Sequence, residues 1–455
     1  MMNDGQQLNQ KRIPRRTLLK STLVAPALIG TSSTPIRAQI QKIRPAAPFR
    51  MDAISFPDFS AARRFLVSDF GAVEGDKRRT SEAIAHAITA ASAAGNGRIV
   101  IPAGTWLTGR IQLKSNVNLH LESGATLIFS SLPDNCLPSV SATREGFDCY
   151  TDAPLVHAHG CENIAITGKG LMLAESDGWT DDIAGRRQPF IHFKRCSGML
   201  IEDITVHAGS LRTIRSQMCN DLVIRRVDIQ ATGHDSESIA AEMSQNILVE
   251  DGVFEQGHDA ISIKSEREVD DWRAGCATRN IVIRNCRIKN GHHLLAIGSD
   301  VSAGVENIFV DNCHFERGTS NTSTESNTTG EINHLVHIKT DGRRGGLVQN
   351  IHVNNLSAPR IAGGAICVET DVPDQRPDPL TTHEARPTPI QGLYLSHVRI
   401  GAAGFVCRID ARAGLFVKDV TLRQIHVASV RQAAVALENV TDFYAHEVHV
   451  ESYAA

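Results

Sequence analysis

HDSESIAAEMSQNILVEDGVFEQGHDAISIKS, residues 234–265, is the stretch that decides the fold of this 455-residue chain. Its segment 246–254, NILVEDGVF, alternates apolar and polar positions, as a strand with one buried face does. Glu237 and His258 flank this segment 21 residues apart, which is close to one coil of a parallel β-helix. Because residues about one coil apart lie side by side on one face, we expect Glu237, His258 and Asp259 to share one site.

The unit at 246–254 recurs along the rest of the chain at intervals of roughly 23 to 43 residues. Each copy starts with a polar or small residue, continues with β-forming residues, and then alternates apolar and polar positions. A single coil cannot bury its own apolar face, so the copies must stack, which predicts an all-β, right-handed parallel β-helix. A β-sandwich or propeller would need tight hairpin signals such as Asn-Gly, which are scarce. The other copies are NIAI (163), GMLIEDITV (198), DLVIRRVDI (221), NIVIRNCRI (280), NIFVDNCHF (307), NIHVNNLSA (350), GLYLSHVRI (392), DVTLRQIHV (419) and DFYAHEVHV (442).

One helical pattern precedes this array of strands. Residues 80–95, TSEAIAHAITAASAAG, place small and apolar residues on one helical face and end in glycine. A solenoid exposes the core of its terminal coil unless another element covers it. We therefore expect residues 60–455 to form one β-helix domain, with an N-terminal cap around 64–130 that includes this short helix.

Residues 1–38 have the composition of an export signal. A basic head is followed by the short apolar run LLKSTLVAPALIG (18–30), and PRRTLLK (14–20) is similar to a twin-arginine signal. The prediction is a periplasmic or secreted protein that is not attached to a membrane once the signal is cleaved. An ordinary secretory signal or a membrane anchor are the alternatives.

Charge and cysteine content limit the expected partners. The net charge of −3 gives no sign of nucleic-acid binding. The ten cysteines are scattered without C-x-x-C pairs, which favours buried core thiols over a metal site, and no disulfide pairing can be assigned. We expect no cofactor and no metal, and a monomeric protein whose partner is its substrate.

Several longer motifs of the chain form a set. They are VSDFGAVEGD (67–76), GNGRIVIPAGTWLTG (95–109), GHDAISIKS (257–265), GHHLLAIGSD (291–300) and HIKTDGRRGG (337–346). Together they resemble glycoside hydrolase family 28, the polygalacturonase and pectin-hydrolase family, and the resemblance covers nearly the whole chain after residue 38. It implies a right-handed β-helix with an open carbohydrate groove on one face, and inverting hydrolysis of α-linked uronic-acid chains in pectic polysaccharide or oligosaccharide.

The four active-site motifs of that family can be placed on this chain, but each departs from the family pattern. Its Asn-Thr-Asp motif falls on 235–237, where Glu237 replaces the aspartate, and its Gly-Asp-Asp motif falls on 257–259, where His258 replaces the first aspartate. Its Gly-His-Gly motif falls on 291–293 and keeps only the first glycine and the histidine. Its Arg-Ile-Lys motif falls on 337–339 and loses the arginine.

The resemblance makes Glu237, His258 and Asp259 the catalytic candidates. An inverting hydrolase needs one protonated acid and one ionised carboxylate about 6.5–9.5 Å apart, with water between them. Glu237 and Asp259 can activate water, and an imidazolium at His258 can serve as the acid; alternatively, Asp259 is the acid and Glu237 the base. His292, His337 and Lys339 are the expected substrate-binding residues, with the lysine ammonium facing a sugar carboxylate.

Two other functions remain open on the same scaffold. A polysaccharide lyase would use Lys339 or His258 to remove a proton beside a carboxylate, without attack by water. A non-catalytic β-helix would bind carbohydrate through a decayed site. Fold alone does not decide between these functions and hydrolysis.

Overall fold

The computed structural model describes most of the chain after residue 38. The export signal predicted at 1–38 lies outside the described residues. No helix in the described part of the chain is long and apolar enough to cross a bilayer. The described ranges are 39–130, 139–144, 147–152, 154–175, 189–209, 212–231, 233, 236–265, 276–316, 332–372 and 386–454.

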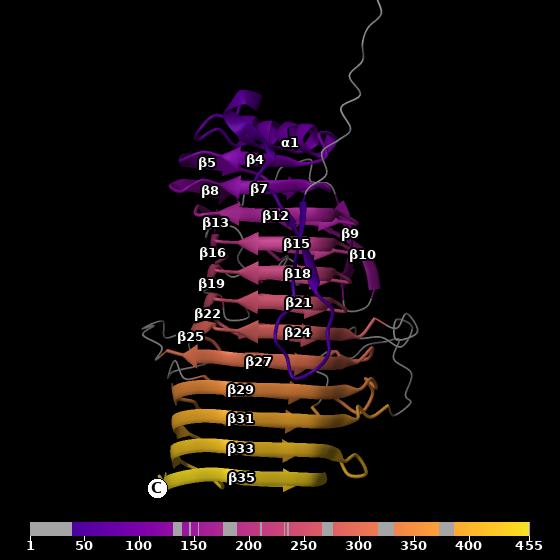
Figure 1. Cartoon of the computed structure of the whole chain (residues 1–455), viewed down its shortest axis with the longest axis vertical. Coiled ribbons are helices and arrows are strands. Elements are labelled where there is room, and N and C mark those ends of the chain that lie inside the picture. The colour runs from indigo at the N-terminus through magenta and orange to yellow at the C-terminus, as the bar shows by residue number, and fades with distance from the viewer. Residues whose placement is uncertain are drawn as a thin grey trace, which may run out of the picture. The chain divides into compact units, whose positions relative to one another are not determined.

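Parallel strands stack rung upon rung along the long axis (Figure 1). Among the described residues, the larger sheet has 20 strands, and each strand pairs with the one a coil earlier and the one a coil later. The strands from β27 onward are single long strands, whereas earlier coils contribute two shorter ones. In chain order they are β3 Arg63–Leu66, β4 Gly97–Ile101, β5 Gly104–Thr108, β7 Val117–Leu121, β8 Ala125–Phe129, β12 Glu162–Gly168, β13 Leu171–Ala174, β15 Ser197–Glu202, β16 Thr205–His207, β18 Asn220–Arg225, β19 Asp228–Ala231, β21 Gln245–Glu250, β22 Val253–Gln256, β24 Thr278–Arg284, β25 Arg287–Asn290, β27 Val305–Phe315, β29 Val348–Arg360, β31 Ile390–Ala403, β33 Val417–Val430 and β35 Val440–Tyr453.

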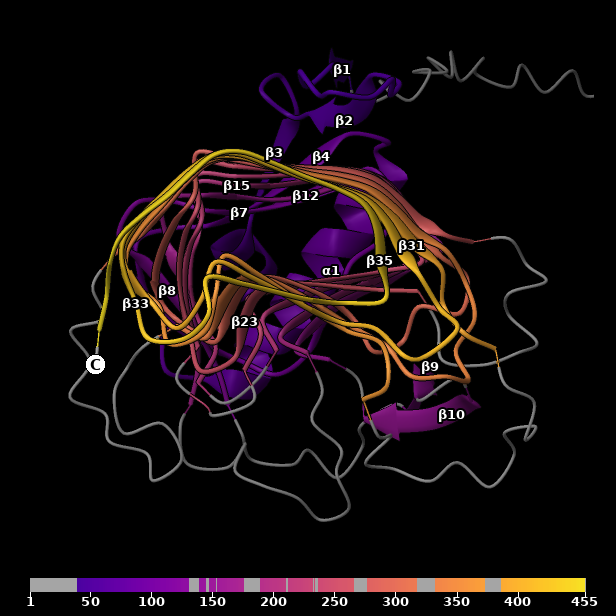
Figure 2. The ribbon, with the colours of Figure 1, turned by 90° about the horizontal axis from the view of Figure 1, so that it is seen from below.

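A second sheet closes the other side of each coil. It has 11 strands in the described part of the chain, all parallel, and β23 lies across the coil interior from β12 and β15 (Figure 2). The candidate active-site residues lie on or beside this sheet, which we call the site sheet. Its strands are β6 Ile111–Gln112, β11 Val156–His159, β14 Ile191–Lys194, β17 Ile214–Gln217, β20 Ile239–Glu242, β23 Asp259–Lys264, β26 His293–Gly298, β28 His334–Lys339, β30 Ile366–Glu369, β32 Cys407–Asp410 and β34 Val435–Glu438.

Both sheets bury one face in a continuous apolar interior. On β23, Ile261 and Ile263 are buried in that core, and they alternate with Ser262 and Lys264 on the opposite face. A strand displays alternate side chains to opposite faces, so the polar residues of the site sheet point away from the core. The same alternation of apolar and polar residues in the sequence predicts the coils.

A ladder of asparagines fixes the register where each coil enters the larger sheet. The side chain of Asn280 donates to Asn246 one coil before it, and Asn307 donates to Asn280, each over 3.0 Å. Both Asn246 and Asn280 have φ of 57°, a left-handed conformation that asparagine tolerates better than most residues. The asparagine that starts several of the repeated units therefore turns the chain at the same point of each coil.

The helix expected from residues 80–95 is present as α1, Lys77–Ala93. The Asp76 side chain accepts a hydrogen bond from the backbone of Arg79 and so caps its N-terminus. Its buried face, including Ala87 and Ile88, joins the same core as the first coils, next to β4 and β5. A short 3₁₀ helix, η1 Val67–Phe70, precedes it.

Two antiparallel strand pairs lie outside the coil: β1 Gln39–Ile43 with β2 Ile54–Asp58, and β9 Ser139–Arg144 with β10 Phe147–Asp152. Around β2, Phe56 and Phe59 pack on outward apolar residues of the larger sheet, such as Leu200. The right-handed parallel β-helix predicted from the sequence is confirmed, whereas the proposed domain limits and the capping role of α1 stay predictions.

Candidate active site

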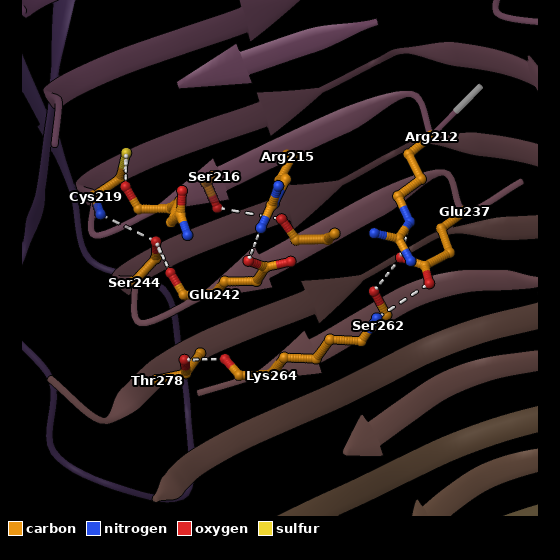
Figure 3. Close-up of polar contacts among 12 residues, drawn as sticks. Arg212, Arg215, Ser216, Cys219, Glu237, Glu242, Ser244, Ser262, Lys264 and Thr278 are labelled. Atoms are coloured by element: carbon orange, nitrogen blue, oxygen red, sulfur yellow. Dashed lines mark hydrogen bonds and ion pairs between the residues drawn. The ribbon is translucent and has the colours of Figure 1, made fainter. Parts of the chain in front are cut away.

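Glu237 lies just before β20 and is held by two cations and a hydroxyl (Figure 3). Its carboxylate accepts a hydrogen bond of 2.8 Å from Ser262 and lies 3.2 Å from the Lys264 ammonium. The Arg212 guanidinium lies 3.5 Å away. Ser262 and Lys264 come from β23, one coil further on, and Arg212 comes from the preceding coil. Three consecutive coils therefore orient this one carboxylate.

These contacts keep Glu237 ionised although it is only 4% exposed. Burial alone raises the pKa of the Glu237 carboxyl, but the charges of Arg212 and Lys264 and the Ser262 hydroxyl outweigh it and lower the pKa to about 2. Glu237 is thus a carboxylate at neutral pH. It can accept a proton, but it does not carry one to donate.

Asp259 is the first residue of β23 and lies between two imidazoles. Nδ1 of His293 is 2.7 Å from one carboxylate oxygen, and Nδ1 of His258 is 3.0 Å from the other. Burial raises the pKa of Asp259, but the contacts with His258 and His293 outweigh it and hold the pKa well below its usual value. Asp259 is therefore also ionised at neutral pH.

Five histidines form a continuous cluster on the site sheet. The ring centroids of His258 and His292 are 4.8 Å apart, and His293 is 4.7 Å from His337 and 5.4 Å from the stacked ring of His334. This cluster extends from the Asp259 carboxylate on β23 to Glu369 on β30, which lies 2.8 Å from Nε2 of His337. Imidazoles therefore line the site sheet at three consecutive strands, β23, β26 and β28, and Glu369 continues the polar cluster on β30.

Two of these imidazoles are neutral at pH 7. Burial and the neighbouring His293 and His337 lower the pKa of His334 to about 3. Burial and His293 also lower the pKa of His337, to about 4, although the hydrogen bond to Glu369 opposes that shift. These side chains offer lone pairs and N–H donors rather than positive charge.

The substrate-binding candidates lie on the same face as the carboxylates. The backbone amide of His292 donates to the His258 carbonyl over 2.6 Å, so these two residues are linked by backbone and by ring contact. Lys339 ends β28, two residues after His337, and pairs in register with Gly298 and Glu369. No residue in the described ranges forms an ion pair with the Lys339 ammonium, so it can receive an anionic ligand.

Sequence reasoning missed several residues of this site. Arg212, Ser262 and Lys264 act on Glu237 from neighbouring coils, and His293 rather than His292 contacts Asp259. Their signal was the coil offset, since Asp259 and His293 stand in register on β23 and β26. Loop insertions make that offset 34 residues here and 22 between Glu237 and Asp259, so spacing alone could not align the three coils.

Two clusters on the site sheet have donor atoms that could hold a metal ion. One consists of Glu237, His258 and Asp259, and the other of His337, Cys367 and Glu369; in each cluster the donor atoms lie within 4.8 Å of one another. The first cluster already satisfies its carboxylates with cations and imidazoles.

Comparison with known proteins adds to this geometry. The sequence profile described as glycosyl hydrolases family 28 matches residues 92–450. The chain belongs to that family. A "Probable polygalacturonase" of Vitis vinifera is 24% identical over 355 residues, covering 74% of this chain and 68% of that protein. An "Exo-poly-alpha-D-galacturonosidase" of Dickeya chrysanthemi is 23% identical over 300 residues, 54% of this chain and 49% of the relative.

A solved exopolygalacturonase structure superposes over most of the chain. The hyperthermoactive exopolygalacturonase of Thermotoga maritima matches with a TM-score of 0.72 and 25% identity, over 88% of this chain and 94% of that one. The Yersinia enterocolitica family 28 exopolygalacturonase matches in fold, with a TM-score of 0.62 and 17% identity, over 88% of this chain and 80% of that one. This family 28 member is a glycoside hydrolase.

For a family 28 hydrolase, the spacing of the two carboxylates limits their roles. A carboxylate oxygen of Glu237 and one of Asp259 lie within 4.8 Å. In inverting glycosidases, the catalytic acid and the catalytic base are separated by about 6.5–9.5 Å. Two ionised carboxylates this close can instead hold one water molecule between them, which leaves the proton donor to another residue.

Proposed function

We propose that this enzyme hydrolyses α-linked galacturonan in pectic polysaccharide or oligosaccharide, with inversion at the cleaved carbon. The observation that carries the proposal is the pair of buried, ionised carboxylates, Glu237 and Asp259, on the outward face of a family 28 β-helix. The names of the relatives in Vitis vinifera, Dickeya chrysanthemi and Thermotoga maritima support the choice of substrate.

In this proposal Glu237 and Asp259 together orient and deprotonate the attacking water. Both carboxylates are ionised, and both can accept the hydrogen bonds of a water molecule placed between them. Glu237 is held by Lys264 and Ser262, and Asp259 by His293, so neither carboxylate has to reorient as the water approaches. Such preorganisation lowers the barrier, because no dipoles have to move during the reaction.

His258 donates the proton to the leaving oxygen. Asp259 cannot do so, since its pKa is far below neutrality. His258 lies within 3.0 Å of Asp259 and has a side chain that is 25% exposed, so the imidazole can reach a substrate in the groove. An imidazole acts as a general acid in its protonated form, and the contact with Asp259 orients the ring.

Lys339, His292 and His337 bind the sugar beside the cleaved bond. The Lys339 ammonium, which forms no ion pair with a described residue, is suited to a galacturonate carboxylate, as a point charge without the forked geometry of arginine. His337, which is neutral at pH 7, and His292 supply hydrogen-bonding groups to sugar hydroxyls. Recognition of the uronate carboxylate therefore depends on Lys339 in this account.

We also propose that residues 1–38 direct twin-arginine export, so that the mature enzyme is a periplasmic or secreted monomer. The basic head, PRRTLLK and the short apolar run support this proposal. Substituting Arg15 and Arg16 by lysine should keep the protein in the cytoplasm of the producing cell. Light scattering of the exported protein should give the mass of a single chain.

A panel of pectic oligosaccharides tests the proposed activity. New reducing ends from galacturonan oligomers, without ultraviolet absorbance from unsaturated sugars, are expected. An unsaturated product would support a lyase instead. Binding of the oligomers without any new reducing ends would support a non-catalytic carbohydrate-binding protein. Neutral galactan oligomers serve as controls and should not be cleaved.

A further inference from the structure

Cys367 occupies an unusual position among the cysteines of the described residues. It is 4% exposed, yet it is not part of the interior core. On β30 it alternates with Ile366 and Val368, which do belong to that core, so its side chain lies on the outward, site-bearing face. By contrast, six other cysteines are core residues: Cys161, Cys196, Cys219, Cys286, Cys313 and Cys407.

Three different donor types meet at this position. Cys367 pairs in register with His337 on β28, and Glu369 follows two residues later on the same face of β30. The donor atoms of the three residues lie within 4.8 Å of one another. The His337–Glu369 contact of 2.8 Å is near the spacing of about 3.3 Å between two ligands on a tetrahedral ion with bonds of about 2.0 Å.

The Cys367 thiol and one ring nitrogen of His337, Nδ1, have no hydrogen-bond partner within the described part of the chain, whereas the other ring nitrogen, Nε2, contacts Glu369. Nδ1 of His337 is buried without a hydrogen-bond partner there, and His337 as a whole is 8% exposed. The Cys367 thiol makes no hydrogen bond to a described residue either. A buried polar atom without a partner is costly, so it indicates a ligand or another unfilled interaction. The Glu369 side chain is 44% exposed, which leaves the cluster open to solvent.

We propose that His337, Cys367 and Glu369 bind one divalent zinc-class cation. A thiolate, an imidazole and a carboxylate are the donor types of zinc, and three protein ligands leave a fourth position for water or a substrate oxygen. His293 and His334, with ring centroids 4.7 and 5.1 Å from His337, surround the site with further imidazoles.

Binding exchanges one proton. The Cys367 sulfur–hydrogen bond is replaced by a sulfur–metal bond, and the proton leaves to solvent, without any oxidation or reduction. Burial and the neighbouring Glu369 raise the pKa of the Cys367 thiol to about 12, so the metal ion itself has to displace the thiol proton. Imidazole is already neutral in this environment and needs no deprotonation.

The cluster of Glu237, His258 and Asp259 is a weaker candidate for a cation. Lys264 and Arg212 already neutralise Glu237, and His258 and His293 already contact both oxygens of Asp259. A cation there would have to displace these partners. At Cys367 it would displace only the contact between His337 and Glu369.

The test titrates metal-free enzyme with Zn²⁺ and, separately, with Co²⁺, and competes each ion with a chromophoric chelator. The expected result is about one equivalent of tightly bound metal and a thiolate-to-cobalt charge-transfer band. Cys367→Ala should abolish that band, and Cys367→Ala, His337→Ala and Glu369→Gln should each weaken binding by about tenfold or more.

Matched variants keep this test specific. Cys313→Ala removes a buried core thiol elsewhere, and His314→Ala removes an exposed imidazole on β27; both should bind metal like the unmodified protein. Glu369 is half-exposed, so Glu369→Gln reports on the site even if a core-facing substitution unfolds the coil. Absence of binding, or a cobalt band that survives Cys367→Ala, would overturn the proposal.

The metal site does not depend on the proposed hydrolysis. Only one consequence does: a cation next to Lys339 would add positive charge where a galacturonate carboxylate binds. If metal binds but galacturonan is not cleaved, the site stands and the proposed function fails. If galacturonan is cleaved by a protein that binds no metal, the proposed function stands and the metal site fails.

Discussion

Nδ1 of His293 lies 2.7 Å from a carboxylate oxygen of Asp259, directly across the rung between β26 and β23. The other oxygen of Asp259 faces His258 at 3.0 Å. One carboxylate is thus fixed from the following coil and from its own chain neighbour. As a result, the Asp259 carboxylate stays ionised and oriented although only 3% of the residue is exposed.

Asp259→Asn should lower kcat by about 10²–10⁴-fold and change KM little, because an amide cannot take a proton from water. Steady-state kinetics on a galacturonan oligomer measure the effect. Asp410→Asn, an exposed carboxylate further along the site sheet, is the matched control and should leave both constants unchanged. Equal activity of Asp259→Asn and the unmodified enzyme would show that Asp259 is not the base that takes a proton from water.

His258→Ala should lower kcat by a similar factor, since the imidazole is the proposed proton donor. His258→Asp should restore part of the activity and move the alkaline limb of the pH–rate profile to lower pH, because the general acid must be protonated and a carboxylic acid loses its proton at lower pH than an imidazolium. If His258→Ala turns over normally while Asp259→Asn is inactive, the imidazole is not the acid.

Lys339→Met should raise KM for galacturonate oligomers by about tenfold or more, with a smaller change in kcat. Methyl-esterified oligomers lack the carboxylate charge, so the substitution should affect their KM much less. The exposed Lys418→Met on β33 serves as the control. An equal effect on charged and esterified substrates would show that Lys339 does not recognise the carboxylate.

Acid should destabilise the enzyme partly through Glu237. Its pKa is about 4.5 when unfolded and about 2 when folded, so the unfolded chain binds the proton first. The contribution of the ionised Glu237 carboxylate to the free energy of unfolding is complete above about pH 4.5 and is lost as pH falls toward 2. It is on the order of 3 kcal/mol.

Urea unfolding at several pH values measures this contribution. The free energy of unfolding of Glu237→Gln should fall less steeply between pH 4.5 and 2 than that of the unmodified enzyme. Parallel curves for the two proteins would mean that Glu237 is not held as a charged group.

The coil register and the site location follow from the sequence, but the inner contacts of the site do not. The alternation in segments such as NILVEDGVF marks which residues face the core, and that pattern is local. The partners of Glu237 and Asp259 come from other coils, across loops of unequal length. Arg212, His293 and Cys367 therefore carry no local signal that distinguishes them from surface residues.

Gly298 illustrates a backbone constraint that the sequence does not reveal. It has φ of 101°, and a Cβ there would lie 1.9 Å from the carbonyl oxygen of Lys339. Gly298→Ala should destabilise the protein by about 1–3 kcal/mol more than Gly71→Ala, whose φ is 93° but whose Cβ would meet nothing within 4 Å. Thermal unfolding compares the two variants, and equal losses would mean that the chain near Lys339 adapts easily.

The central claim is that Glu237 and Asp259 direct water onto a galacturonan bond. Digestion of a short galacturonate oligomer in heavy-oxygen water, followed by mass analysis, tests it most directly. We predict one heavy oxygen at each newly formed reducing end, and none in Glu237→Gln or Asp259→Asn. Products lighter by one water and without the label would show elimination instead, and would contradict the account.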